Sequence, residues 1–177
     1  MTQINRLSLH TATLENANQL NRQLIEGLNT FIDSETTRKS HHFFGRYENI
    51  YIDSQQIPAI DSVLNAVKIH AAEILGRPVD TLKAGLWFNV MNPGDKTTLH
   101  RHDDDDELLS AVYYVQVGEN SGTLYLEQPP FQIQVTPEPG MFVFFPPDMP
   151  HEVTENMSNL CRISLGINIG PAQPEYN

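Results

Sequence analysis

The feature that most constrains the fold is a change of pattern after residue 80. From there the chain consists of short segments rich in β-branched and aromatic residues, which favour strands. Turn-forming stretches separate them, such as Asn-Pro-Gly-Asp at 92–95 and Pro-Glu-Pro-Gly at 137–140. Short strands at this regular spacing predict a double-sheet jelly roll or a barrel. The predicted strands are 82–92, 97–102, 108–117, 122–128, 131–137, 140–146, 151–156 and 161–169.

The first part of the chain has helical rather than alternating patterns. Residues 14–33 carry Leu20, Leu24, Leu28 and Phe31 at helical spacing, and 57–75 form a second helical segment. Pro58 suits the first turn of the second helix, Gly76 its end, and Thr13 is a candidate cap for the first helix. Residues 4–10 alternate and predict an opening strand, whereas 34–49 lack periodicity and are expected to be a loop.

These patterns together predict one domain over residues 1–177, mainly β with N-terminal helices (α+β). Residues 1–80 would supply the opening strand and helical support, and 81–177 the β core. The exposed edges of short strands are compatible with a homodimer.

Charge and composition exclude several partners. The net charge is −11 without a basic cluster, so we expect no nucleic-acid binding. We find no signal peptide and no apolar run long enough to span a bilayer, so we expect no membrane association. The only cysteine is Cys161, which permits no intrachain disulfide and makes the cytoplasm the expected compartment.

A concentration of metal-binding groups lies at the end of the second predicted strand and directly before the third, in "LHRHDDDDELLSAVYYV" at 99–115. His100, His102 and Asp104 are spaced by two, so an extended backbone points all three side chains to one face. His151 follows a turn and precedes a short strand, which we expect on the facing sheet. Two histidines and a carboxylate with open positions are the ligand set of non-haem Fe(II) oxygenases. The alternative is a solvated acidic loop beside unrelated histidines.

Arg162 is the basic residue best placed to bind a ligand. It lies eleven residues after His151, between Cys161 and Ile163, so we expect it on a neighbouring strand and aimed into the same cavity. A buried charge needs a partner, and a ligand carboxylate held by two hydrogen bonds would supply it. The alternative is an outward Arg162 paired with a surface acid.

Two polar residues are candidates to share this cavity. Tyr114 lies on one strand face with Ser110 and Val112, so its hydroxyl could donate to the same carboxylate. Asn89 could be a polar group on the cavity wall. The alternatives are that Tyr114 is a packed core aromatic and that Asn89 and Trp87 only support the sheet.

Four quoted segments resemble a known family: "WFNVMNPGDKTTLHRH", "LLSAVYYVQVGENSGTLYLEQP", "TPEPGMFVFFPPDMPHEVTEN" and "RISLGINIG". In this order they are similar to the 2-oxoglutarate- and Fe(II)-dependent oxygenases, most closely to a small, prolyl-hydroxylase-like bacterial group. The resemblance covers roughly residues 82–170 and implies a double-stranded β-helix, the cupin-like jelly roll. The resemblance also implies that His151 is the distal iron ligand, that Arg162 binds the far carboxylate of 2-oxoglutarate, and that Tyr114 assists Arg162 in binding that carboxylate.

The resemblance leaves two registers for the remaining iron ligands. Counting forward from Asn92 favours His100 and His102, whereas counting back from Ser110, or requiring a carboxylate, favours His102 and Asp104. We favour His100, His102 and His151, with Asp104 as the alternative to His100.

The implied activity is hydroxylation of an unidentified small molecule or protein residue. Fe(II), 2-oxoglutarate and dioxygen would take part, with release of succinate and carbon dioxide. Residues 34–49 and the acidic run 103–107 are expected at the entrance, where the acids would favour a cationic substrate or only aid solubility. The alternatives are a cupin-like metalloenzyme that does not use 2-oxoglutarate and a non-catalytic jelly-roll binding module.

Overall fold

The computed structural model describes residues 8–101 and 106–172. Over these ranges the chain forms two antiparallel sheets and two α-helices. The larger sheet has seven strands, in the order β1 (His10–Thr13), β9 (Met141–Phe145), β6 (Leu109–Gln116), β11 (Arg162–Pro171), β4 (Leu82–Met91), β3 (Arg46–Tyr51) and β2 (Arg38–Phe43). The smaller sheet has four, in the order β5 (Thr97–His100), β10 (His151–Val153), β7 (Leu124–Gln128) and β8 (Phe131–Val135).

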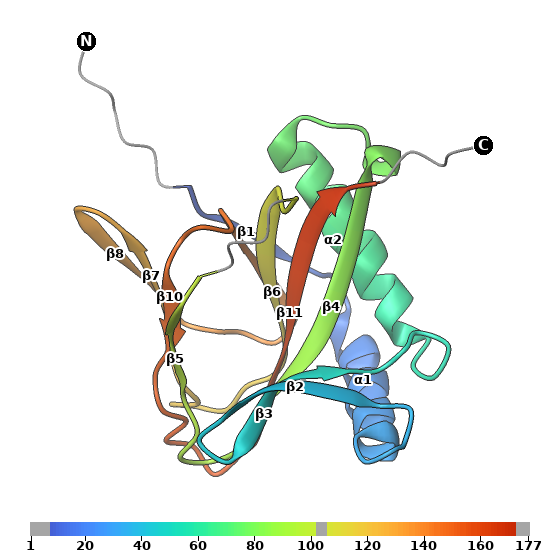
Figure 1. The fold of residues 1–177 in the computed structure, drawn as a ribbon, viewed down its shortest axis with the longest axis vertical. Helices are drawn as coiled ribbons and strands as arrows, with labels where there is room; N and C mark the ends of the chain where they lie inside the picture. The colour runs from blue at the N-terminus through green and yellow to red at the C-terminus, as the bar shows by residue number, and fades with distance from the viewer. Residues whose placement is uncertain (1–7, 102–105, 173–177) are drawn as a thin grey trace.

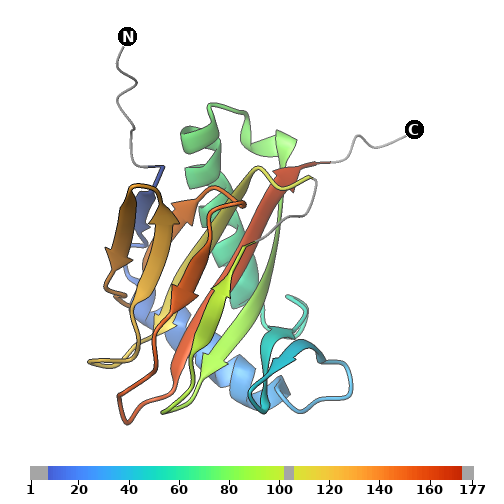
Figure 2. The same ribbon diagram turned by 60° about the vertical axis from the view of Figure 1, so that its left-hand side comes forward.

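The large sheet is covered on both faces. Helices α1 (Ala17–Phe31) and α2 (Ala59–Leu75) lie on its outer face, and the small sheet lies over its inner face (Figure 1). Figure 2 shows the small sheet in front of the long strands β4 and β11. A short 3₁₀ turn, η1 (Val79–Thr81), connects α2 to β4. The cavity described below therefore lies between the two sheets.

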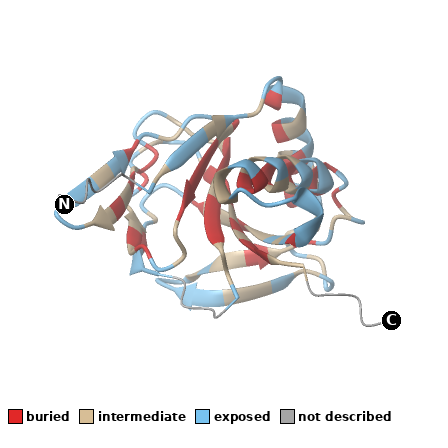
Figure 3. Cartoon of the chain, turned by 90° about the horizontal axis from the view of Figure 1, so that it is seen from above, coloured by how far each residue is buried: buried red, intermediate tan, exposed pale blue. Residues whose placement is uncertain are grey.

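The strand β11 shows how the sequence separates the two faces. Its apolar residues Ile163, Leu165, Ile167 and Ile169 pack in the core beneath the helices. The residues between them face the small sheet, because successive strand side chains point to opposite faces. The helices supply the other half of this core, including Leu24, Val63 and Val67, none of which is exposed. In Figure 3 the buried residues gather in the central strands and in the helices against them.

Most of the predicted elements are confirmed. Each of the eight strand segments after residue 80 contains a strand, and both helical segments contain a helix. Gly76 ends α2 with a left-handed backbone, φ 63°, and Pro58 directly precedes that helix. Asn16, not Thr13, is the N-cap of α1, because Thr13 is the last residue of β1. That strand begins at His10, and residues 4–7 of the predicted opening strand lie outside the described ranges.

The expectation of a loop at 34–49 is wrong. Residues 38–51 form a hairpin in which β2 pairs with β3, from Arg38 opposite Tyr51 to Phe43 opposite Arg46. Phe44 and Gly45 form the turn with φ values of 49° and 81°, as a tight hairpin of this hand requires. Among the strand residues of this hairpin only Ile50 is buried, so neither face demands alternating apolar residues, and the pattern that reveals a strand is absent.

None of the helices in the described part of the chain is long and apolar enough to cross a bilayer.

Candidate metal and 2-oxoglutarate site

Two histidines that are far apart in the sequence meet in the small sheet. His151 begins β10 and lies opposite His100, the last residue of β5. Their ring centroids are 4.3 Å apart at an interplanar angle of 55°. His151 is buried, with its ring 4.8 Å from that of Phe145. The expected position of His151 on the sheet facing His100 is wrong, because β10 pairs directly with β5 in the same sheet.

The backbone fixes the tautomer of both imidazoles. His100 Nδ1 lies 2.8 Å from the carbonyl oxygen of Thr98, and His151 Nδ1 lies 2.9 Å from that of Met149. A carbonyl oxygen only accepts, so Nδ1 must carry the hydrogen and donate it. The lone pair of each neutral ring is therefore on Nε2, as in histidines that bind metals through Nε2. The chemistry and spacing of this pair fit one metal ion that receives a nitrogen from each ring.

The remaining predicted ligands, His102 and Asp104, lie outside the described residues. Within the described ranges, no group of three or more histidine, cysteine, aspartate or glutamate side chains could hold a metal ion. The structure thus brings together two members of the predicted set, His100 and His151.

Arg162 is a buried cation without an acidic partner. It begins β11 in the large sheet, so it faces His151 from the opposite sheet; the expected position on a neighbouring strand is wrong. Only 2% of the residue is exposed, which also excludes the outward-facing alternative. Nη1 lies 3.1 Å from the sulfur of Met91, and Nε has no hydrogen-bond partner among the residues described. No carboxylate in those ranges forms an ion pair with it.

Tyr114 lies beside this guanidinium. The Arg162 Cζ is 5.3 Å from the centroid of the Tyr114 ring, and the Tyr114 hydroxyl has no partner in the described part of the structure. Burial raises the pKa of the Tyr114 phenol, and the nearby Arg162 opposes this only in part. The hydroxyl is therefore protonated at neutral pH and can donate a hydrogen bond. Burial also lowers the pKa of Arg162, with Tyr114 acting in the opposite direction.

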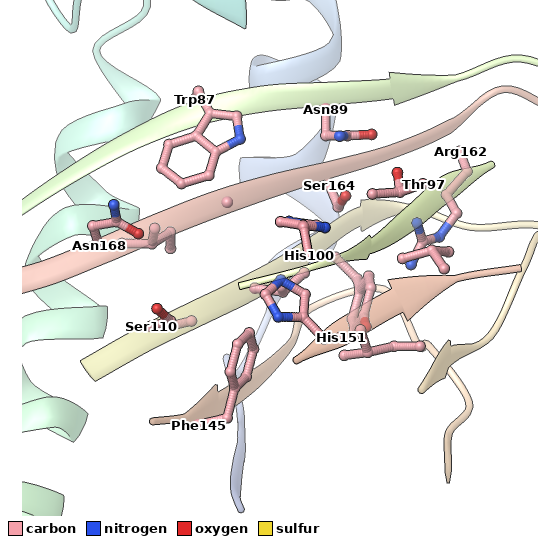
Figure 4. Close-up of a pocket in the computed structure, with 17 residues that line it drawn as sticks. Trp87, Asn89, Thr97, His100, Ser110, Phe145, His151, Arg162, Ser164 and Asn168 are labelled. Atoms are coloured by element: carbon pink, nitrogen blue, oxygen red, sulfur yellow. The ribbon is translucent and has the colours of Figure 1, made fainter. Parts of the chain in front are cut away.

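Both groups line a cavity between the sheets that also contains the imidazole pair. Figure 4 shows His100 and His151 near its centre and Arg162 to one side. The other labelled residues form the walls: Trp87, Asn89, Thr97, Ser110, Phe145, Ser164 and Asn168. In this cavity the Arg162 guanidinium would attract the negative group of an anionic ligand, and the imidazole nitrogens lie at the centre.

The wall of the large sheet follows the strand register. Asn89, Ser164 and Tyr114 lie side by side on β4, β11 and β6. In the next row the Trp87 indole lies over Gly166, where a Cβ would come within 2.4 Å of the ring. Glycine is therefore required for the indole to lie flat against this wall.

The hairpin β2–β3 forms one side of the entrance. Arg46 on β3 donates to the Lys96 carbonyl and the Thr97 hydroxyl, both at 3.0 Å, and to Glu48 at 2.9 Å. These bonds hold the hairpin against the start of β5. The groove between them is lined by His41, Phe43, Glu48, Asn49, Tyr51, Trp87, Asn89, residues 97–101 and Asn168. The expectation that residues 34–49 border the entrance agrees with this groove, although they are a hairpin.

Ser164 and Asn168 are cavity residues that were not predicted from the sequence. Both lie on the inner face of β11 and line the cavity. Their signal is the strict alternation in "RISLGINI", where polar or small residues at 162, 164, 166 and 168 alternate with isoleucine and leucine. Once Arg162 is placed in the cavity, a spacing of two predicts the other members.

The family comparison agrees with this geometry. The model of the 2OG-Fe(II) oxygenase superfamily matches residues 86–170, which contain every residue of the candidate site. The matched part of the chain, residues 86–170, belongs to this superfamily of Fe(II)- and 2-oxoglutarate-dependent oxygenases. No curated protein matches the chain.

Solved structures show the same fold. A prolyl-4-hydroxylase from Pseudomonas putida has 20% identity and a TM-score of 0.70, covering 93% of this chain and 88% of that one. A prolyl hydroxylase from Trichoplax adhaerens, in complex with a hypoxia inducible factor peptide fragment, has 14% identity and a TM-score of 0.72, covering 95% and 86%. A viral collagen prolyl hydroxylase from Paramecium Bursaria Chlorella virus-1, in complex with 2OG, has 13% identity and a TM-score of 0.65, covering 92% and 95%.

Family and fold together confirm the expected class. The chain is a double-stranded β-helix and an oxygenase that uses Fe(II), 2-oxoglutarate and dioxygen. This decides against the cupin-like enzyme without 2-oxoglutarate and against the non-catalytic binding module.

Proposed function

We propose that His100, His102 and His151 bind the Fe(II) of a hydroxylase. The observation that carries this assignment is the pairing of His100 with His151, whose rings lie 4.3 Å apart and each donate from Nδ1 to a backbone carbonyl. This pairing favours the register that begins at His100 and adds His102, two residues further along the chain. Asp104 is the alternative to His100.

Arg162 and Tyr114 would bind the far carboxylate of 2-oxoglutarate. The guanidinium is buried without an ion-pair partner in the described ranges, so a carboxylate would neutralise it through charge-assisted hydrogen bonds. The neutral Tyr114 hydroxyl would add a donor from β6. Bound iron, with 2-oxoglutarate and dioxygen, supplies oxidative decarboxylation to succinate and carbon dioxide and the hydroxylation of a C–H bond.

Asn89 has a supporting part in this proposal. Its Oδ1 lies 3.5 Å from Arg46 Nη1, and it shares its row of the sheet with Ser164 and Tyr114. We assign Asn89 to the polar wall beside the bound co-substrate, where it also links that wall to the entrance hairpin.

The decisive experiment is anaerobic titration of the protein with Fe(II) and then with 2-oxoglutarate. We expect the visible charge-transfer absorption of an iron-chelated 2-oxo acid. Its absence in folded, iron-loaded protein would overturn the proposal.

A matched pair of variants decides between the registers. His100→Ala should lose Fe(II) binding while Asp104→Ala keeps it. The reverse result would assign the site to His102, Asp104 and His151.

The substrate of the proposed hydroxylase is a small molecule or a protein residue. We also propose a homodimer, since β2 and β8 are the outer strands of their sheets and expose Phe43 and Phe131 by about half. A single-chain mass in light scattering at micromolar concentration would contradict it.

A further inference from the structure

Two polar side chains lie at the end of the cavity away from Arg162. Ser110 on β6 and Asn168 on β11 are direct partners in the strand register. Both line the cavity that contains His100 and His151. Figure 4 shows them on one side of the imidazoles, with Arg162 on the other. The cavity thus has a cationic end and a second, uncharged polar end.

The hydrogen-bonding groups at this second end are buried and unsatisfied. Ser110 is 2% exposed, and its hydroxyl has no hydrogen-bond partner among the described residues. The same holds for the Asn168 side-chain oxygen. Native proteins leave few buried polar atoms in this condition, because each costs about 1–3 kcal/mol. A bound ligand is a direct way to satisfy both.

The neighbouring Glu107 fixes the orientation of the Asn168 amide. Asn168 Nδ2 donates to Glu107 Oε1, and a carboxylate can only accept, so the nitrogen must face Glu107. The amide oxygen is then the atom left for a ligand. Because a carboxylate lies behind the amide, this end of the cavity favours positive or neutral groups and disfavours anions.

We propose that Ser110 and Asn168 bind a hydrogen-bond donor of the primary substrate, namely a hydroxyl, an amide N–H or an ammonium group. This inference rests on the proposed function, which assigns the Arg162 end to 2-oxoglutarate. A dianion does not suit the Asn168 end, so that end is left for the second organic substrate. Asn168 also lines the groove beside the β2–β3 hairpin, which gives this substrate a route from the surface.

The experiment uses four probes with one carbon skeleton and different polar groups: cyclopentylamine, cyclopentanol, cyclopentanone and cyclopentanecarboxylate. Binding to the full chain, loaded with Zn(II) and 2-oxoglutarate, is measured by ligand-observed NMR titration. The first two probes donate hydrogen bonds, the ketone only accepts them, and the acid is anionic at neutral pH. We expect the two donors to bind at least about tenfold more tightly than the ketone, and the acid to bind most weakly.

Variants assign the effect to the two residues. Asn168→Leu and Ser110→Ala should each weaken binding of the donors about tenfold without changing that of the ketone. Ser110→Ala leaves the hydrogen bond between Asn168 and Glu107 in place, so it still tests the inference if Asn168→Leu fails to fold. Ser121→Ala is the matched control, because Ser121 is also 2% exposed with an unpartnered hydroxyl but lines a different cavity. Ser121→Ala should leave the affinity for all four probes unchanged.

The charge-transfer absorption separates this inference from the proposed function. Wild-type protein without the absorption contradicts the proposed function. An absorption that is normal in wild type and variants, with probes that do not discriminate or that bind the variants equally well, overturns the inference. Failure of both donor probes to bind wild type at millimolar concentration also counts against it.

Discussion

The two faces of the seven-stranded sheet have different chemistry, and two adjacent tyrosines show the difference. Tyr113 and Tyr114 are both fully buried on β6 and point to opposite faces. Beneath the helices, the Tyr113 hydroxyl donates to Asn21 Oδ1 at 2.7 Å. Toward the small sheet, the Tyr114 hydroxyl has no partner in the described structure. The outer face satisfies its polar groups internally, whereas the inner face leaves them for ligands.

This difference separates stability from binding. The outer face is a continuous apolar core, so its residues should contribute mainly to folding. The inner face contains a buried guanidinium and several unpartnered hydroxyl and amide groups, which cost stability unless something binds them. Substitutions on the two faces should therefore affect different measurements.

The largest expected effect is on the inner face. Arg162→Leu should weaken 2-oxoglutarate binding on the order of a thousandfold, because it removes the buried partner of a carboxylate. The free energy of unfolding should stay the same or rise by about 1 kcal/mol, since an unpaired buried charge is lost. Anaerobic titration and urea unfolding measure the two quantities. Arg162→Lys is the control. Its affinity for 2-oxoglutarate should lie between those of the wild type and Arg162→Leu, because lysine keeps the charge but cannot form two parallel hydrogen bonds to a carboxylate.

The converse change is on the outer face of the same strand. Leu165 is fully buried beneath the helices, so Leu165→Ala should lower the free energy of unfolding by about 3 kcal/mol. The affinity for 2-oxoglutarate, measured well below the unfolding temperature, should be unchanged. A large loss of affinity in folded Leu165→Ala would mean that the two faces are coupled.

The adjacent tyrosines allow a finer test. Tyr114→Phe should weaken 2-oxoglutarate binding about tenfold with little change in unfolding. Tyr113→Phe should lower the free energy of unfolding by about 1 kcal/mol, because Asn21 Oδ1 loses its donor, and should leave 2-oxoglutarate binding intact. If both variants changed the same quantity, the separation of the faces would be wrong.

The smallest expected effect appears at high pH. Burial raises the pKa of Tyr113 to about 12, although the hydrogen bond that its hydroxyl donates to Asn21 acts in the opposite direction. The folded state therefore favours the neutral phenol, and this contribution is complete below the unfolded pKa of about 10. It is lost as the pH rises from there through about 12. The fall in unfolding free energy between pH 9 and 11 should be shallower in Tyr113→Phe, as urea unfolding would show; equal slopes would contradict it.

The sequence predicted the strand-rich half well because most of those strands have one or both faces at least partly buried. Buried strands must use branched and aromatic residues, and turn residues must separate them. The β2–β3 hairpin was missed because Ile50 is the one buried residue of its two strands, so its pairing depends on the turn at Phe44–Gly45 rather than on a hydrophobic pattern.

For the site, the residue types and spacings identified His100, His151, Arg162 and Tyr114 as cavity groups. They did not show which strands would be neighbours. His151 pairs beside His100, and Arg162 faces them from the other sheet, because the order of strands in a jelly roll depends on long-range packing that local patterns do not encode. Ser110 and Asn168 could not be predicted as one binding site, because only the register of β6 and β11 places them side by side.

The imidazoles of His100 and His151 are each oriented by a main-chain oxygen two positions earlier in the chain. Because these anchors belong to the backbone, no point substitution of Thr98 or Met149 can delete them, short of displacing the backbone itself. The orientation of the two rings is thereby insulated from substitutions at these two positions. Related sequences are free to vary the pocket side chains while the two imidazoles, the proposed iron ligands, keep the same orientation.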